Sequence, residues 1–185
     1  MPGNNSAGWR LDECVWELEL AEGKKKALYR VRKSGIQGLG VFAATKLRKG
    51  QRVIEYAGER ITNAEADRRY DDDKMKRHHT FLFTVDNKTV IDGAVDGSDA
   101  RLINHSCDPN CEAVIEKKRI FIYALKTIHP GTELAYDYQY ERTGENDDDL
   151  EKFYKCRCGA ENCRGTIMKM PKKKKTKKAT KRAKQ

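Results

Sequence analysis

The chain contains 185 residues, of which 38 are basic and 28 acidic, and its formal net charge is +10. This length supports one domain with short appendages. Because 36% of the residues are charged, the hydrophobic core of that domain must be compact. The sequence has no apolar run long enough for a membrane helix, and it begins without the apolar core of a signal peptide. We therefore expect an intracellular protein with no membrane contact.

The positive charge is concentrated near the C-terminus. Residues 169–185 contain ten Lys and Arg side chains and no acid, so residues 1–168 carry 28 basic and 28 acidic groups. Such a segment lacks the apolar surface that folding requires, and we predict a disordered lysine-rich tail. A polycation of this kind suits the phosphate backbone of DNA, which makes DNA an expected partner. A tail that only increases solubility is the alternative.

The first predicted elements are strands. Residues 1–26 form an N-terminal extension, and the alternation of apolar and acidic residues between positions 9 and 20 predicts a strand there. Residues 27–31 and 40–43 have strand character on either side of a glycine turn, and residues 51–56 form the next strand. Thr62 and Glu65 have the spacing of a capping box. This box opens the main helix, which we expect to end near Lys74.

The second half of the chain contains more short strands. They are predicted at residues 81–85, 89–92, 112–115 and 119–125, followed by a last strand that carries Tyr136 and Tyr138. Residues 141–153 form an acidic linker, in which the three aspartates 147–149 are expected in a solvated loop. Many short strands with little helix indicate a mainly β fold with short helices.

Three of the six cysteines, Cys156, Cys158 and Cys163, lie within eight residues. In an intracellular chain this crowding favours metal binding over disulfides, and a closed structural zinc site needs a fourth ligand from elsewhere. A set of free thiols is the alternative. Cys14 and Cys111 are expected to be buried thiols, and the pair at residues 78–79, two histidines, is expected to be exposed without a role.

Two polar and aromatic segments carry the strongest signal. Residues 101–111 have the sequence Arg-Leu-Ile-Asn-His-Ser-Cys-Asp-Pro-Asn-Cys, and residues 133–138 have Glu-Leu-Ala-Tyr-Asp-Tyr. With the glycine turn at 35–40, Glu-Tyr-Ala-Gly-Glu at 55–59 and the cysteine segment, they resemble the SET-domain protein-lysine methyltransferases, most closely the trithorax/MLL subgroup. The resemblance implies a SET domain over residues 27–140, built of small sheets with a C-terminal pseudoknot. It also implies a post-SET zinc segment over residues 154–168.

The resemblance also implies roles for individual residues. S-adenosylmethionine would be bound by Gln37, Gly38, Leu39, Phe81, Asn104 and His105; close relatives carry tyrosine at the position of Phe81. Tyr138 would be the catalytic tyrosine, Tyr136 the product-specificity residue and Tyr56 a wall of the lysine channel. One zinc ion would be held by Cys107, Cys156, Cys158 and Cys163. Without the resemblance, the glycine turn is a tight hairpin, Asn104–His105 a polar loop and the tyrosines packing residues.

These implications define the expected function. The chain would be a monomeric S-adenosylmethionine-dependent protein-lysine N-methyltransferase that acts on lysine in a basic, flexible tail of a histone or another DNA-packaging protein. We expect it to be associated with chromatin or a nucleoid. The alternative is a non-catalytic SET-fold module that binds chromatin. Such a degenerate module would be expected to lose Tyr138 or the Asn104–His105 pair, and this chain keeps both.

Overall fold

The computed structural model describes residues 27–70, 80–142 and 147–171. The strand predicted between residues 9 and 20, Cys14, the histidine pair at 78–79 and residues 172–185 of the tail lie outside these ranges. Within them the chain forms ten short strands, two α-helices and one 3-10 helix, and the strands make four small sheets. The prediction of a mainly β fold with short helices is confirmed.

The described chain begins with an antiparallel hairpin. β1 (Tyr29–Lys33) pairs with β2 (Leu39–Ala43), in a register that places Arg30 opposite Phe42. The Ser34 amide donates to the Gly38 carbonyl at 2.9 Å and closes the turn. Gly38 has a φ of 52°, a left-handed conformation that glycine adopts without steric cost.

The main core lies on a three-stranded antiparallel sheet. Its central strand is β9 (Arg119–Ala124), which is flanked by β3 (Arg52–Tyr56) and β8 (Cys111–Glu116). Ile120 and Ile122 of β9 are fully buried, as expected for β-branched residues on the packed face of a sheet. Cys111 is also fully buried, which confirms its prediction as a buried thiol.

A second three-stranded sheet carries the main helix. Its strand order is β4 (Glu59–Ile61), β6 (Val90–Asp92) and β5 (Leu82–Thr84), and α1 (Asn63–Arg69) follows β4. Thr62 caps α1 as predicted, because its hydroxyl accepts a hydrogen bond from the Glu65 amide at 3.1 Å. The Glu65 carboxylate pairs with Arg68 and Arg69.

The predicted end of this helix near Lys74 is wrong, because α1 ends at Arg69. Tyr70 leaves the helical conformation, with φ −124° and ψ 71°. Its hydroxyl donates to the two carboxylate oxygens of Asp92, at 3.1 and 3.0 Å, and Arg69 also contacts this carboxylate at 3.1 Å. Asp92 is completely buried, so its tertiary contacts fix Tyr70 outside the helix, and the three aspartates that follow in the sequence have low helix propensity.

Two very short strands bring the signature segments together. β7 (Asn104–His105), which follows the 3-10 helix η2 (Asp99–Leu102), pairs in parallel with β10 (Ala135–Tyr136). On its other side β10 contacts Asn110, whose side chain accepts from the Ala135 amide at 2.9 Å and donates to the Glu133 carbonyl at 2.7 Å. Residues 133–136 therefore lie between β7 and Asn110, as the resemblance implies. The last strand ends before Tyr138, which the sequence analysis had placed within it.

The structure also corrects the prediction of a loop within the acidic linker. The three aspartates expected in a loop begin a helix, α2 (Asp147–Phe153). Asp149, in the first turn of α2, pairs with Lys152 one turn away at 3.0 Å. Arg142 forms an ion pair with Glu151 and ties α2 to the preceding chain.

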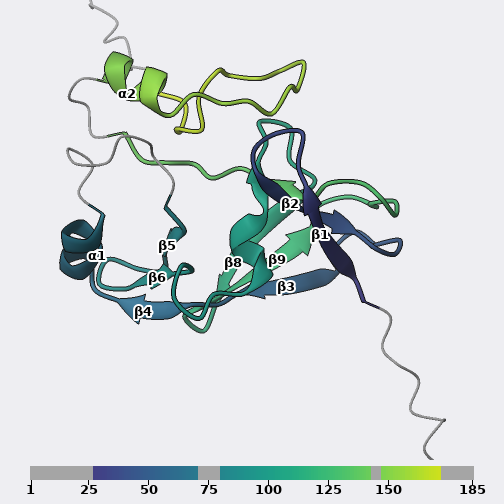
Figure 1. The fold of residues 1–185 in the computed structure, drawn as a ribbon, viewed down its shortest axis with the longest axis horizontal. Helices are drawn as coiled ribbons and strands as arrows, with labels where there is room; N and C mark the ends of the chain where they lie inside the picture. Colours follow the sequence, from purple (N-terminus) through teal and green to yellow (C-terminus); the bar gives the residue numbers. More distant parts are fainter. Residues whose placement is uncertain (1–26, 71–79, 143–146, 172–185) are drawn as a thin grey trace, which may run out of the picture.

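Figure 1 shows how these parts are arranged. The β1–β2 hairpin lies at the right, the second sheet and α1 at the left, and the β3–β9–β8 sheet between them. The C-terminal segment with α2 crosses above (Figure 1). Among the described residues, no helix is long and apolar enough to span a membrane.

Candidate functional site

A cavity of about 1930 Å³ lies between the hairpin turn, the second sheet and the C-terminal segment. A pocket for one small ligand typically measures ~300–1,000 Å³, so this central cavity has room for two. Nine of its lining residues are those predicted to bind the cofactor or to act in catalysis: Gln37, Gly38, Leu39, Tyr56, Phe81, Asn104, His105, Tyr136 and Tyr138. The fold therefore brings together residues that are spread over about a hundred positions of the sequence.

One wall of the central cavity is a series of aromatic rings. The ring of Tyr56 lies 5.3 Å from that of Phe83, which stacks on Tyr136 at 6.0 Å. Tyr136 in turn lies 4.9 Å from Tyr138, and Tyr138 lies 6.3 Å from Tyr140. These separations are those of packed aromatic pairs, so the rings form a continuous, rigid and largely apolar surface.

Two of these tyrosines hold their hydroxyls in fixed directions. Tyr138 donates to the carbonyl of Ile103, and Tyr56 donates to the carbonyl of Phe81, both at 2.7 Å. Burial raises the pKa of Tyr138 and of Tyr56 well above the usual value for tyrosine. Both side chains are therefore protonated and uncharged at neutral pH, and each hydroxyl oxygen keeps its lone pairs for a third group.

Asn104 joins the hairpin turn to the last strand. Its Nδ2 lies 3.0 Å from the Ser34 hydroxyl, 2.9 Å from Oε1 of Glu133, and 3.2 and 3.1 Å from the carbonyls of Gln37 and Leu39. The Ser34 hydroxyl also donates to Oε1 of Glu133 at 2.7 Å. The carboxylate of Glu133 thus accepts from two side chains at the edge of the central cavity and orients both.

Gly40 is required for this network. A Cβ atom at this position would lie 2.3 Å from Oε1 of Glu133 and 3.0 Å from the Ser34 Cβ. A side chain would therefore displace the carboxylate from its two partners. Gly40 is the third glycine of the turn, and close approach of Glu133 is the physical reason for it.

His105 is buried, with 4% of its surface exposed, and is held from both ring nitrogens. The Tyr138 amide donates to Nδ1 at 3.2 Å, which leaves the ring proton on Nε2, 3.3 Å from the Cys107 sulfur. Burial lowers the pKa of His105 to about 4, against the opposing effect of Asp137. The imidazole is therefore neutral at pH 7 and contacts both the Tyr138 segment and the cysteine cluster.

Four cysteine sulfurs surround one point. The sulfur of Cys107 lies 3.8 Å from that of Cys156 and 4.0 Å from that of Cys163, and with Cys158 the four lie within 4.8 Å of one another. A disulfide would need about 2.05 Å. A tetrahedral zinc site with Zn–S bonds of about 2.3 Å places its sulfurs about 3.8 Å apart, so the spacing fits zinc.

Each of the four sulfurs also receives a backbone amide. The amides of Arg164, Cys158, Cys107 and Gly165 donate to the sulfurs of Cys107, Cys156, Cys158 and Cys163 respectively, at 3.4 to 3.5 Å. Amide donors stabilise thiolates, the form that binds metal. Burial alone would raise the pKa of Cys158, but its amide partners outweigh burial and lower the pKa to about 6.

Comparison with known families decides the identity of this fold. The SET domain model matches residues 38–139, more than half of the chain. The chain belongs to the SET-domain family. The family predicted from the signature segments is therefore confirmed.

Several curated proteins contain a similar SET domain. "Histone-lysine N-methyltransferase, H3 lysine-4 specific" of Emericella nidulans is 41% identical over 151 residues, and its namesake in Saccharomyces cerevisiae is 43% identical over 154 residues. "Histone-lysine N-methyltransferase 2D" of Homo sapiens is 42% identical over 144 residues. These matches cover 78%, 78% and 76% of this chain but only 12%, 13% and 2% of the relatives, respectively. They agree with the predicted resemblance to the trithorax/MLL subgroup.

A salt bridge links the cysteine cluster of this SET domain to the central cavity. The guanidinium of Arg164 contacts the carboxylate of Asp137 at 2.8 and 2.5 Å, and its backbone amide donates to the Cys107 sulfur. Burial opposes ionisation of Asp137, but Arg164 outweighs it and lowers the pKa of the carboxyl group. Asp137 lies between Tyr136 and Tyr138, so the cysteine segment is tied directly to the aromatic wall.

Sequence reasoning missed several residues that shape the SET-domain site. Ser34, Phe83, Glu133 and Arg164 were not singled out, although each contacts a predicted site residue. Arg164 follows Cys163 directly, and Glu133 opens the Glu-Leu-Ala-Tyr-Asp-Tyr segment, so both lay beside recognised motifs. Ser34 and Phe83 had no sequence signal, because only tertiary packing brings them to the cavity.

Phe81, for which the resemblance implied tyrosine, lines the central cavity. The guanidinium of Arg101 lies over the Phe81 ring, 5.7 Å from the centroid. The Phe81 carbonyl accepts a hydrogen bond from the Tyr56 hydroxyl. The backbone of Phe81 thus has a structural role that does not depend on a side-chain hydroxyl. Its ring offers an apolar face backed by a cation.

Proposed function

We propose that the chain is an S-adenosylmethionine-dependent protein-lysine N-methyltransferase whose substrate is a lysine in the basic, flexible tail of a histone. The observation that carries this proposal is the convergence of the nine predicted residues on one cavity with room for two ligands. The cavity combines the main chain of the hairpin turn, the Asn104 amide and the Phe81 ring, a set that suits a nucleoside bearing an amino-acid group. When bound, S-adenosylmethionine supplies an electrophilic methyl group on a positively charged sulfur.

Side chains of the protein would favour the neutral, reactive form of the substrate lysine. A lysine amine must be neutral to accept a methyl group, and its unperturbed pKa is about 10.4. An amine between Tyr56, Phe83 and Tyr136 loses contact with water, and this desolvation disfavours the ammonium form. The aromatic wall therefore favours the reactive form of the substrate without a strong base.

Tyr138 is the proposed catalytic residue. It stays protonated, and its hydrogen is donated to the Ile103 carbonyl, so its oxygen is left to accept from the amine or from a methyl C–H group. The fixed direction of this oxygen aligns the amine for in-line attack. Tyr136 is the proposed product-specificity residue; its side chain crowds the site and favours mono- and dimethyl-lysine over trimethyl-lysine.

Histone H3 is the proposed protein substrate, at lysine 4 or its sequence equivalent. The support is the printed specificity of the fungal relatives, which are 41% and 43% identical to this chain over more than three quarters of its length. We place the protein with chromatin on the same grounds.

The test is transfer of a labelled methyl group to an H3 tail peptide, analysed by mass spectrometry over a time course. The matched control peptide carries arginine in place of lysine 4. Methylation of the first peptide alone, with mono- and dimethyl products, is the expected result. Cofactor binding without transfer to any histone would show that the chain is a non-catalytic SET-fold module.

Three further features belong to this proposal. Cys107, Cys156, Cys158 and Cys163 would hold one structural zinc ion, and the protein would act as a monomer. The lysine-rich tail would bind the DNA backbone. Lys169 is not part of the tail, because it bonds to Tyr140 and Glu141, so a truncation that tests the tail belongs after Pro171. That truncation should reduce the salt dependence of DNA binding without changing activity on a short peptide.

A further inference from the structure

Residues 27–54 contain seven basic side chains and no acidic one. All seven are exposed: Arg30, Arg32, Lys33, Lys46, Arg48, Lys49 and Arg52. Elsewhere in the described chain basic side chains commonly pair with acids, as Arg69, Arg119, Arg142 and Arg164 do. The balanced charge of residues 1–168 therefore conceals a strongly uneven surface.

Five of these residues lie on the β1–β2 hairpin and on the segment that follows it. Arg30 and Arg32 are two positions apart on β1, so both side chains leave the same face of the hairpin, opposite the partly buried Tyr29 and Val31. The segment with Lys46, Arg48 and Lys49 continues from β2. We call Arg30, Arg32, Lys46, Arg48 and Lys49 the hairpin basic surface.

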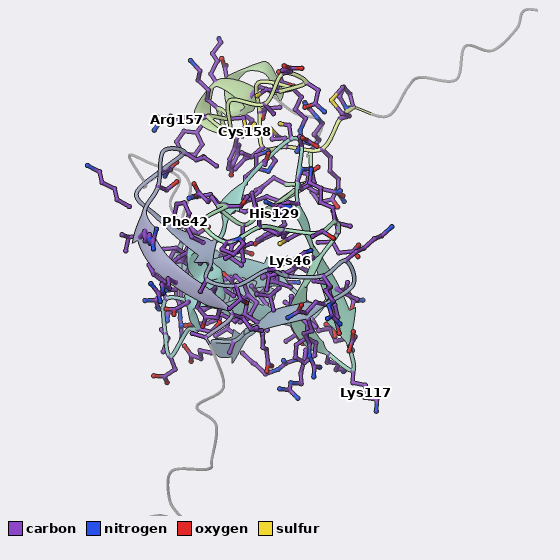
Figure 2. The ribbon with its side chains drawn as sticks, turned by 90° about the vertical axis from the view of Figure 1, so that its right-hand side faces the viewer. Phe42, Lys46, Lys117, His129, Arg157 and Cys158 are labelled. Atoms are coloured by element: carbon purple, nitrogen blue, oxygen red, sulfur yellow. The ribbon has the colours of Figure 1, made fainter. Side chains whose placement is uncertain are left out.

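The segment that carries these lysines is held firmly. Leu47, between Lys46 and Arg48, is completely buried and exchanges two backbone hydrogen bonds with Ile128, at 2.9 and 3.0 Å. The Ala44 amide donates to the Leu28 carbonyl next to β1 at 2.9 Å. Figure 2 faces this side, where Lys46 and His129 lie near one another and Phe42, the partner of Arg30, lies beside them, while Lys117 projects at a distant edge.

The charges of this surface are not neutralised within the protein. None of its five side chains has an ion-pair partner in the part of the chain that the structure describes. Two acidic residues of the described chain contact the hairpin. Glu133 forms a bridge with Phe42, and its carboxylate is occupied by Ser34 and Asn104, while Asp99 interacts with Tyr29. The hairpin basic surface thus presents uncompensated positive charge on a rigid support.

We propose that the hairpin basic surface binds the phosphate backbone of double-stranded DNA. Residues two apart on a strand are separated by about 6.7 Å and share a face, so Arg30 and Arg32 can contact the backbone of one DNA strand together. Guanidinium groups suit bidentate phosphate contacts. No residue of the surface lines the central cavity, so DNA held here leaves the cavity open to a protein substrate.

This inference extends beyond the proposed activity and beyond the tail. It predicts that the folded body contributes its own electrostatic affinity for DNA. A protein bound to the DNA of a DNA–protein particle by this surface would keep its cavity close to the protein tails of that particle. The hairpin basic surface would therefore increase the local concentration of the substrate rather than recognise a sequence.

The test uses the full chain with four substitutions, Arg30→Gln, Arg32→Gln, Lys46→Gln and Arg48→Gln. The matched control removes four charges from another cluster, Arg60→Gln, Lys88→Gln, Lys117→Gln and Lys118→Gln; that cluster is joined by contacts of Lys118 with Asp86 and Arg60. Both variants have the same net charge and the same tail. Binding to a short duplex of random sequence is measured by anisotropy at several salt concentrations.

The surface variant should bind DNA at least tenfold more weakly at low salt than the control. The slope of log K against log salt should fall by about 3 relative to the control, at about 0.9 per lost phosphate contact. Equal slopes in the two variants would overturn the proposal, because net charge alone would then explain binding. Loss of binding to anionic vesicles with unchanged DNA binding would overturn it in favour of a lipid surface.

Methylation of a short H3 peptide is measured in the same variants. Because the substituted residues lie outside the cavity, we expect unchanged peptide activity in both. An inactive wild-type chain that binds DNA through this surface would refute the proposed methyltransferase and leave the DNA surface standing. An active chain with no difference between the two variants in DNA binding would support the proposed methyltransferase and refute the DNA surface.

Discussion

At the scale of single residues, the Tyr138 hydroxyl gives the most direct prediction. The substitution Tyr138→Phe removes the oxygen that is fixed by the Ile103 carbonyl, while the packing against Tyr136 remains. We expect cofactor affinity to stay within twofold and kcat to fall about 100-fold, or about 2.7 kcal/mol. Tyr123→Phe is the control, because the Tyr123 hydroxyl donates a hydrogen bond to Glu116 on the neighbouring strand β8. Near wild-type turnover in the Tyr138 variant would remove the tyrosine from the mechanism.

Gly40 provides a second prediction at this scale. Gly40→Ala forces the Glu133 carboxylate away from Ser34 and Asn104, since the new Cβ would meet Oε1 at 2.3 Å. We expect the cofactor to bind about 10-fold more weakly by calorimetry, or about 1.4 kcal/mol. Gly35→Ala in the same turn is the control, because nothing lies within 4 Å of its added Cβ. Equal affinities in the two variants would mean that the Glu133 network does not position the turn.

At the scale of elements, α1 depends on one buried carboxylate. Asp92 is fully buried and accepts from Tyr70, Arg69 and the Ala94 amide. Asp92→Asn replaces one acceptor oxygen by a donor and leaves Arg69 without this charge partner. We expect a loss of about 3 kcal/mol in the free energy of unfolding by urea.

The matched control is Asp67→Asn, on the exposed surface of the same helix. It should change the unfolding free energy by no more than about 0.5 kcal/mol, as surface substitutions usually do. A small effect of Asp92→Asn would show that the second sheet holds α1 by apolar contacts alone.

The cysteine segment gives the other element-scale prediction. We expect one zinc per chain by elemental analysis, and we expect Cys163→Ser to lose it while Cys111→Ala, outside the cluster, retains it. Removal of zinc by a chelator should make residues 154–169 more sensitive to protease, because only the contacts with Tyr140 and the Arg164–Asp137 salt bridge would then attach the cysteine segment to the domain. Active protein without metal would contradict this assignment.

At the scale of the whole molecule, local patterns predicted most of the elements. The hairpin, β3, β8 and β9 lie within a few residues of their predicted ranges, because alternation and turn residues act over short distances. The Thr62 cap is local as well and was predicted correctly. What periodicity could not predict was the assembly of four small sheets around one cavity, and this came only from the family resemblance.

Two of the errors share a physical cause. The helix end at Arg69 and the short β7–β10 pair are both set by residues far away in the sequence, Asp92 in one case and the opposite strand in the other. The site was predicted where residues form contiguous motifs, as Asn104–His105 does, and missed where a single residue such as Phe83 reaches the cavity through packing. Sequence patterns carry little information about such contacts.

The pairing of β10 with residues far away in the sequence also affects the order in which parts of the domain fold. His105 and Tyr138 are separated by 33 residues and Cys107 and Thr166 by 59, yet both pairs are in contact. Closing such long loops before their contacts form is costly in entropy, and topologies of this kind fold slowly. A nascent chain that has emerged only as far as β9 has a complete hairpin and main sheet but no cavity wall. The wall of the cavity is therefore completed only after β10 and the cysteine segment have been synthesised, and we expect shorter chains not to form the proposed binding site.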